Sequence, residues 1–352
     1  MSITINSDVG ASFSDFILTF AMCQIFFYYK STNITKTINQ INNDNMKRTV
    51  FLLFVLALTV SCLAGKKKSV LNCKPKAGHV VLIGIDGWGA YSVPKANDIP
   101  NIKYFMNNGC HTLKDRTVLP SASAINWASM FMGVPTEMHG YTTWNSRTPE
   151  IPSAHTNNNN ICPTIFSVLR DQMPNAETGC LFEWDGIKYL VDTLSISHVA
   201  QAANCEKDNR QLVNMAAEYI KAKIPKFVAV CIDQLDHTGH AEGHDTPAYY
   251  KTLDDVDKQI GIIMQAVKDA GIWDNTVFIL TADHGGINKG HGGQTLQEMQ
   301  IPFIICGKNI KKGMTITDTM MQYDCAATIA EIFGLKRPQS WRGQPAYSVF
   351  LK

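Results

Sequence analysis

The sequence predicts an α/β fold in which a mostly parallel central sheet is covered by helices on both faces. From residue 78 onward, apolar β-favouring runs alternate with segments of helical periodicity. Three of these runs end in turns that carry aspartate or histidine, as buried parallel strands do when they deliver functional groups at their carboxyl ends. At 352 residues and 45% hydrophobic content, the chain can form one large domain or two small ones.

Composition narrows the function classes. A net charge of +2, without any long block of like charge, argues against a nucleic-acid scaffold. The ten cysteines are too few for the length of the chain to form a disulfide scaffold.

The first 77 residues are expected to lie outside the fold. Residues 1–45 show no amphipathic period, whereas residues 46–64 combine a basic start, a short apolar core and small residues, which is typical of a secretory signal peptide. We therefore expect translation to start at Met46 and the mature protein to be secreted, periplasmic or on the cell surface. A transmembrane anchor is disfavoured because the apolar run is shorter than about 18 residues. Lipidation at Cys62 is a weaker option, since Thr59 suits a lipoprotein signal poorly.

After a polar linker (residues 65–77), a single catalytic domain is predicted over residues 78–352, beginning with a strand over His79–Ile85 that ends at Asp86. A helix is predicted from Pro100 to Gly109, with Gly109 closing it. Next, a turn of small residues runs from Leu119 into a helix that contains Trp127.

Two serines lie in that turn, Ser121 and Ser123. A hydroxyl at a helix start lies close to free backbone N–H groups, which favour an anionic substrate. Simple N-capping is the alternative for either serine.

The middle of the chain is less regular. Helices are predicted at Thr164–Met173 and Arg210–Lys223 from their apolar spacing. The rest of residues 142–224 is expected to be partly sheet and partly a small insertion near the active site, and the sequence does not divide the two.

A strand over Phe227–Ile232 precedes a dense group of acidic and histidine residues, Asp233 to His240. Such a density indicates metal ligands, although not all of these residues can bind one ion. A long helix follows over Pro247–Ala270, then a further strand at Ile301–Cys306 and a last helix at Asp324–Phe333, with Gly334 after its end.

Between them lies the most informative stretch, Thr276 to Gly293. An apolar run stops at Asp283 and His284, and two glycines and then His291 follow. In a turn relaxed by glycine, both side chains can converge on a cation. A plain polar loop is the alternative for this dipeptide taken alone.

These elements together resemble the alkaline phosphatase superfamily, and within it the type I phosphodiesterases (nucleotide pyrophosphatase/phosphodiesterase group). The resemblance rests on five elements in the same order, from Gly78 to Tyr347: Asp86-Gly, a hydroxyl behind Pro120, Asp-x-x-Gly-His at Asp236–His240, Asp283-His284-Gly285, and Gly-His291-Gly-Gly. It implies an alkaline-phosphatase-like fold and two divalent metal ions, most often zinc.

The resemblance also implies roles for individual residues. One zinc would take Asp86, Asp283 and His284 and contact the nucleophile Ser123, and the other would take Asp236, His240 and His291. Asn145 would hold a non-bridging phosphate oxygen, although one extra residue separates it from the matching His139-Gly140. Asp233, His237 and His244 fall outside the motif and are expected to support the ligands or lie on the surface.

The chemistry is consistent with these roles. Two metals about 3.5–4 Å apart can stabilise both the entering and the leaving oxygen of a phosphoryl displacement, and one of them can lower the pKa of the serine hydroxyl. Carboxylate and imidazole ligands suit zinc, with manganese as second choice. The predicted function is an exported two-metal phosphohydrolase that cleaves phosphodiester or pyrophosphate bonds of a small nucleotide-like substrate through a phosphoryl-serine intermediate.

Two departures from the family pattern leave alternatives open. The phenylalanine expected after the nucleophile is Ala124, and Arg147 could hold a second phosphate charge. Both leave a phosphomonoesterase possible, and a non-catalytic binding protein is a second alternative. A sulfatase is disfavoured because its Cys/Ser-x-Pro-x-Arg segment is absent.

Overall fold

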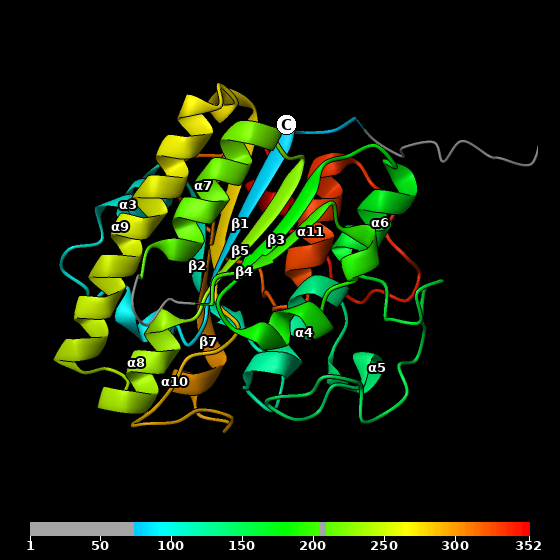
Figure 1. Cartoon of the computed structure of the whole chain (residues 1–352). Helices are drawn as coiled ribbons and strands as arrows, with labels where there is room; N and C mark the ends of the chain where they lie inside the picture. The colour runs from blue at the N-terminus through cyan, green and yellow to red at the C-terminus, as the bar shows by residue number, and fades with distance from the viewer. Residues whose placement is uncertain (1–73, 204–208) are drawn as a thin grey trace, which may run out of the picture. The chain divides into compact units, whose positions relative to one another are not determined.

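The computed structural model describes residues 74–203 and 209–352, all within one compact unit (Figure 1). Its centre is an eight-stranded sheet with the strand order β4-β3-β5-β1-β6-β7-β2-β8. The strands are β1 His79–Ile85, β2 Gly109–Arg116, β3 Thr178–Phe182, β4 His198–Gln201, β5 Phe227–Ile232, β6 Thr276–Thr281, β7 Gln300–Gly307 and β8 Met314–Thr315.

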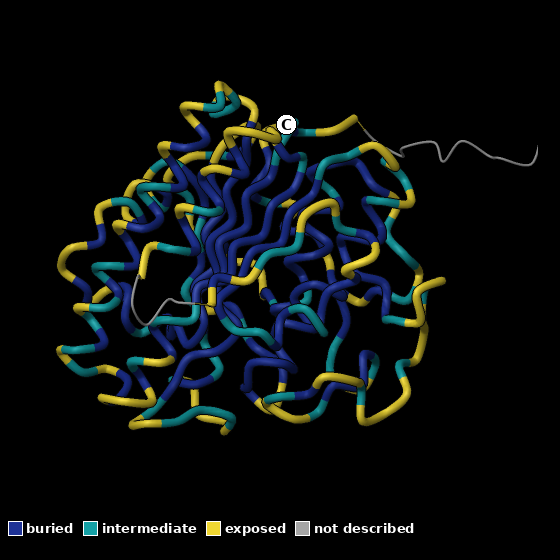
Figure 2. Tube along the Cα trace, viewed as in Figure 1, coloured by how far each residue is buried: buried dark blue, intermediate teal, exposed yellow. Residues whose placement is uncertain are grey.

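The predicted mostly parallel sheet is confirmed. Strands β4, β3, β5, β1 and β6 pair in parallel, and β2 pairs in parallel with β8. Within the described sheet only β7 runs antiparallel, to both β6 and β2. Strands β1, β5 and β6 are almost continuously apolar because both of their faces are covered, and Figure 2 shows a buried centre.

Helices cover both faces of this sheet (Figure 1). One hydrophobic cluster contains side chains of α4, α6 and α11, and the other contains side chains of α3, α7 and α9. The helices are α3 Pro100–Asn108, α4 Ser123–Met132, α5 Thr136–His139, α6 Ile165–Gln172, α7 Gln211–Lys223, α8 Gln234–Glu242, α9 Pro247–Asp269, α10 Leu296–Met299 and α11 Asp324–Phe333.

Most predicted elements match within one residue at each end, but β2 was missed. Its sequence, GCHTLKDR, mixes polar and apolar residues because it lies near the sheet edge between β7 and the short β8. The role given to Gly109 was also wrong. Its backbone is extended (φ −140°), and its missing side chain lets the β7 backbone approach at Ile305.

The segment Asp236–His240 was read as part of a turn after β5, whereas it forms helix α8. The spacing of four residues places Asp236 and His240 on one face of this helix. In the middle region, β3 and β4 belong to the sheet, and residues 140–163 form an irregular segment between α5 and α6.

The predicted upstream segment, the signal peptide, Cys62 and most of the linker lie outside the described residues, so they stay predictions. Within the described ranges, none of the helices combines the length and apolar character required to cross a bilayer. The six cysteines of those ranges, including Cys231 on β5 and Cys306 on β7, are buried free thiols.

Candidate metal centre and active site

Three neighbouring parallel strands bring acidic residues to one edge of the sheet. In the order β5-β1-β6 they end just before Asp233, Asp86 and Asp283. The register pairs Ile85 with Ile232 and Gly84 with Thr281, so the three chain ends are level. The carboxylates therefore meet at the carboxyl ends of the strands, where open α/β sheets bind ligands.

The structure brings the residues of the first predicted ligand set together. Asp86, Asp283 and His284 offer donor atoms within 4.8 Å of one another, and all three residues are buried. One oxygen of each carboxylate is held: Trp127 Nε1 donates to Asp86 Oδ2 over 3.0 Å, and the Gly87 amide donates to Asp283 Oδ1 over 3.2 Å. The other oxygens, Asp86 Oδ1 and Asp283 Oδ2, are buried without a hydrogen-bond partner.

Ser123 lies against this set. It is the first residue of α4, and its Oγ is 3.1 Å from His284 Nε2. The helix has no side-chain cap, since its N-cap is Ala122, so the capping alternative fails for both serines. Ser121 Oγ instead donates to the Gly293 carbonyl over 2.6 Å.

The amide of Ala124 already donates to the Trp144 carbonyl, over 3.1 Å. It is therefore not one of the free helix amides that were expected to receive phosphate oxygens.

The second ligand set centres on Asp236. His240 Nε2 lies 3.2 Å from Asp236 Oδ2, and His291 Nε2 lies 3.9 Å from Asp236 Oδ1. Asp236, His291 and His284 also form a group within 4.8 Å, so His284 lies between the two sets. Asp236 Oδ1 is a third buried carboxylate oxygen without a partner.

The histidines share one hydrogen-bond pattern. Nδ1 of His240, His284 and His291 lies 3.0, 2.8 and 3.2 Å from the carbonyls of Lys289, Gly285 and Ser121, respectively. A carbonyl can only accept, so Nδ1 carries the hydrogen and Nε2 of the neutral ring presents its lone pair to the site. Metal-binding histidines are commonly held in this way.

These donors fit divalent cations. Three buried carboxylate oxygens without partners and three imidazole nitrogens form an oxygen and nitrogen set that suits zinc. Burying such carboxylates together is costly unless a cation compensates their charge.

The pKa shifts of these residues also indicate that the buried carboxylates need a compensating cation. Burial raises the pKa of Asp86 well above its ordinary value and that of Asp283 to about 7. Burial lowers the pKa of His291 to about 4, whereas the hydrogen bond to Asp236 raises that of His240 to about 9. Burial opposes ionisation of Asp236 as well, but its contacts with the neighbouring histidines, above all the one with His240, outweigh burial and lower its pKa.

The two predicted substrate residues lie outside these sets. Asn145 is half-buried, and within the described ranges its side chain makes no hydrogen bond. Arg147 is paired with Asp185 at 3.2 and 3.3 Å, donates to Tyr189 Oη over 3.0 Å, and stacks on the Tyr189 ring. It could hold a phosphate only by exchanging Asp185 for the substrate.

Sequence reasoning gave no specific role to two residues that reach the site. Asp233 groups with Asp86 and Asp236 within 4.8 Å, and burial raises its pKa to about 7. His244 is buried against Asp236, whereas His237 is exposed as expected. The sequence signal that could have found them is their position beside the Asp236–His240 motif: Asp233 directly precedes α8, and His244 lies just after it.

A cavity of about 490 Å³ opens beside the second ligand set. Its walls include His240, His291 and Trp144, whose side chain is 61% exposed. Ala124 is fully buried, so the position of the family phenylalanine contributes nothing to this cavity.

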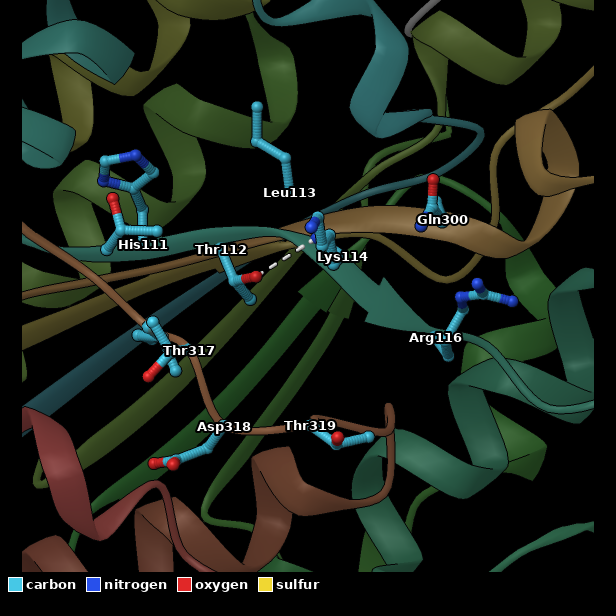
Figure 3. A pocket seen from close by; sticks show the side chains of 11 residues that line it. His111, Thr112, Leu113, Lys114, Arg116, Gln300, Thr317, Asp318 and Thr319 are labelled. Carbon is cyan, nitrogen blue, oxygen red and sulfur yellow. Dashed lines mark hydrogen bonds between the residues drawn. The ribbon is translucent and has the colours of Figure 1, made fainter.

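A larger cavity of about 670 Å³ lies elsewhere, between β2 and the segment after β8 (Figure 3). None of the predicted site residues lines it. Its labelled side chains, such as His111, Arg116 and Asp318, point in different directions rather than toward one point.

Comparison with known proteins identifies the relatives of this chain. The family model described as type I phosphodiesterase / nucleotide pyrophosphatase matches residues 80–289, more than half of the chain. The murine ectonucleotide pyrophosphatase/phosphodiesterase 5, in an inactive form in complex with AMP, has a similar fold, with a TM-score of 0.59 at 16% identity. The match covers 74% of this chain and 96% of that one.

Two curated relatives match over shorter regions. The mouse bis(5'-adenosyl)-triphosphatase enpp4 is 23% identical over 59% of this chain and 47% of its own length. A phosphopentomutase from Alkaliphilus oremlandii is 30% identical over 41% of this chain and 35% of its own length. The matched region thus spans less than half of either relative.

Proposed function

The chain belongs to the type I phosphodiesterase/nucleotide pyrophosphatase family, and on that premise we propose that it is a two-metal hydrolase of phosphodiester or pyrophosphate bonds with Ser123 as nucleophile. The position of the Ser123 hydroxyl carries this proposal. It lies 3.1 Å from Nε2 of His284, beside the unpartnered oxygens of Asp86 and Asp283. A binding protein without activity would have no need of a hydroxyl at this point.

Asp86, Asp283 and His284 would hold one cation, and Asp236, His240 and His291 the other. When bound, two zinc ions would supply Lewis-acid stabilisation of the entering and leaving oxygens and lower the pKa of the hydroxyl. Trp127 and the Gly87 amide orient the ligand carboxylates of Asp86 and Asp283.

The reaction has two displacements on phosphorus. Ser123 loses its proton, its Oγ–P bond forms, and the ester or anhydride bond to the leaving group breaks. Water then attacks the same phosphorus, the Oγ–P bond breaks, and the serine regains a proton. The product keeps the substituent that remained on phosphorus.

Two observations favour a diester or pyrophosphate over a monoester. The cavity beside His240 and His291 gives space for a second substituent, and Trp144 offers that substituent an aromatic face. The guanidinium of Arg147, the group proposed to bind a monoester charge, is engaged by Asp185. We therefore place a phosphomonoesterase second.

Hydrolysis rates test this proposal. After zinc reconstitution, bis(p-nitrophenyl) phosphate should be cleaved faster than p-nitrophenyl phosphate, and chelation should abolish both activities. Faster cleavage of the monoester would favour the phosphatase, and no cleavage of either ester by zinc-loaded protein would favour the binding protein.

Export through the signal at Met46 belongs to the same proposal. N-terminal sequencing of native protein should find a start between Cys62 and Gly65. A chain that retains Ser2 would contradict both the signal peptide and the start at Met46.

A further inference from the structure

His244 is a buried histidine beside the second ligand set. It lies just beyond α8, and its side chain has no exposed surface. Its Nε2 is 3.6 Å from Oδ1 of Asp236. Both atoms are buried, and neither has a hydrogen-bond partner within normal distance among the described residues. Two buried polar atoms without other partners therefore face each other at slightly more than hydrogen-bond distance.

Two glycines make room for the imidazole. A Cβ atom at Gly239 on α8, or at Gly286 in the turn after β6, would collide with the His244 ring. The carbonyl of Asn288 accepts the backbone N–H of His244 over 2.6 Å and lies 3.2 Å from Nδ1. The ring is therefore fixed from three sides, with Nε2 directed at Asp236.

His244 differs from the ligand histidines on the Nδ1 side of its ring. The carbonyl that its Nδ1 faces, that of Asn288, already accepts the backbone N–H of His244 over 2.6 Å. Its Nε2 faces a carboxylate oxygen without a partner, which is the stronger acceptor, so the hydrogen of the neutral ring is placed on Nε2.

We propose that His244 is a positioning residue, which donates its Nε2–H to Oδ1 of Asp236 and so fixes the orientation in which that carboxylate meets the second cation. The proposal rests on the two-metal function proposed above. Hydrogen-bond partners of metal ligands commonly change metal affinity by about 10–100-fold when they are removed. Loss of the donor should therefore weaken the second ion and leave the first in place.

Three variants separate donation from packing. His244→Leu removes the donor but keeps a side chain of similar volume, whereas His244→Gln retains an N–H donor. His237→Leu is the matched control, because His237 is an exposed histidine on α8 itself. Zinc dissociation constants are measured for each variant by competition with a chromophoric chelator, together with the melting temperature in excess chelator.

We expect the second zinc to bind about 10–100-fold more weakly to His244→Leu, and His244→Gln and His237→Leu to stay close to the parent. Unchanged affinity in His244→Leu would overturn the proposal. So would an equal loss in the leucine and glutamine variants, because the ring itself would then be required. If the parent binds fewer than two ions, the proposed function fails first, which is a distinct result.

A measurement on the parent decides the matter even if His244→Leu does not fold. In zinc-loaded protein labelled with ¹⁵N-histidine, Nε2 of His244 should give the signal of a protonated ring nitrogen. The signal is assigned by its loss in His244→Gln. An unprotonated or metal-bound Nε2 would overturn the proposal.

Discussion

The Oγ atom of Ser123 lies 3.1 Å from Nε2 of His284, although 161 residues separate them in the sequence. His284 donates its Nδ1–H to the adjacent Gly285 carbonyl, so its Nε2 can accept the serine proton or bind a cation. This contact distinguishes Ser123 from Ser121, whose hydroxyl is directed at Gly293.

The first prediction concerns this serine pair. Ser123→Ala should lose turnover by several orders of magnitude yet bind both metals, because the hydroxyl is a weak ligand beside three stronger ones. Ser121→Ala should keep most activity and lose about 0.5–1.5 kcal/mol of unfolding free energy with its hydrogen bond. Trapping with substrate at low pH and mapping the phosphorylated peptide checks the assignment. Phosphate on Ser121 would reverse it, and phosphate on neither serine would remove the covalent step.

The second prediction concerns metal content. Active protein should contain two zinc ions per chain by elemental analysis. His291→Ala should lower the occupancy of the second ion more than that of the first, because Asp86, Asp283 and His284 remain. A content of one ion or none in active protein would contradict the two-metal mechanism.

The third prediction concerns pH. Cations bind the deprotonated ligands, and the pKa is about 9 for His240 and about 7 for Asp283. Zinc affinity should therefore rise from pH 6 to pH 9, with proton release at the lower pH. Calorimetric titration in buffers of different ionisation enthalpy measures both quantities. An affinity that stays constant across this range would contradict the prediction.

The same pKa values give a sign for the stability of zinc-free protein. Both pKa values lie above those of the unfolded chain, so the folded state binds more protons. Its stability should fall as the pH rises from about 3.8 to 7 because of Asp283, and from about 6.5 to 9 because of His240, since in these windows the unfolded chain has lost a proton that the folded protein keeps. The difference in melting temperature between zinc-loaded and chelated samples should accordingly widen over that range.

The fourth prediction concerns Trp144, whose exposed ring lines the cavity beside His240 and His291. Stacking of a base on an aromatic ring contributes about 1–3 kcal/mol. Trp144→Ala should therefore lower kcat/KM about 5–150-fold for the p-nitrophenyl ester of thymidine 5'-monophosphate. The p-nitrophenyl ester of methyl phosphate is the control, because it has the same leaving group and no base. An equal loss on both esters would show that Trp144 does not bind the base.

The sequence by itself determined those elements whose local residue pattern shows both the secondary structure and the functional residue at its end. The apolar runs of β1, β5 and β6, each followed by an acidic residue, are readable because a strand buried on both faces must be continuously apolar. The spacing of Asp236 and His240 and the order of the motifs were likewise sufficient to identify the family and to predict two ligand sets.

Tertiary structure decided what depends on contacts between distant segments. The edge position of β2 hid a strand whose sequence has no clear period, and Gly109 serves a close approach to β7 that no local pattern reveals. The orientation of the Ser123 hydroxyl, the pairing of Arg147 with Asp185 and the burial of His244 against Asp236 are of the same kind. Local sequence specifies backbone preference and burial, whereas the partner of a polar side chain is fixed only when the fold brings distant residues together.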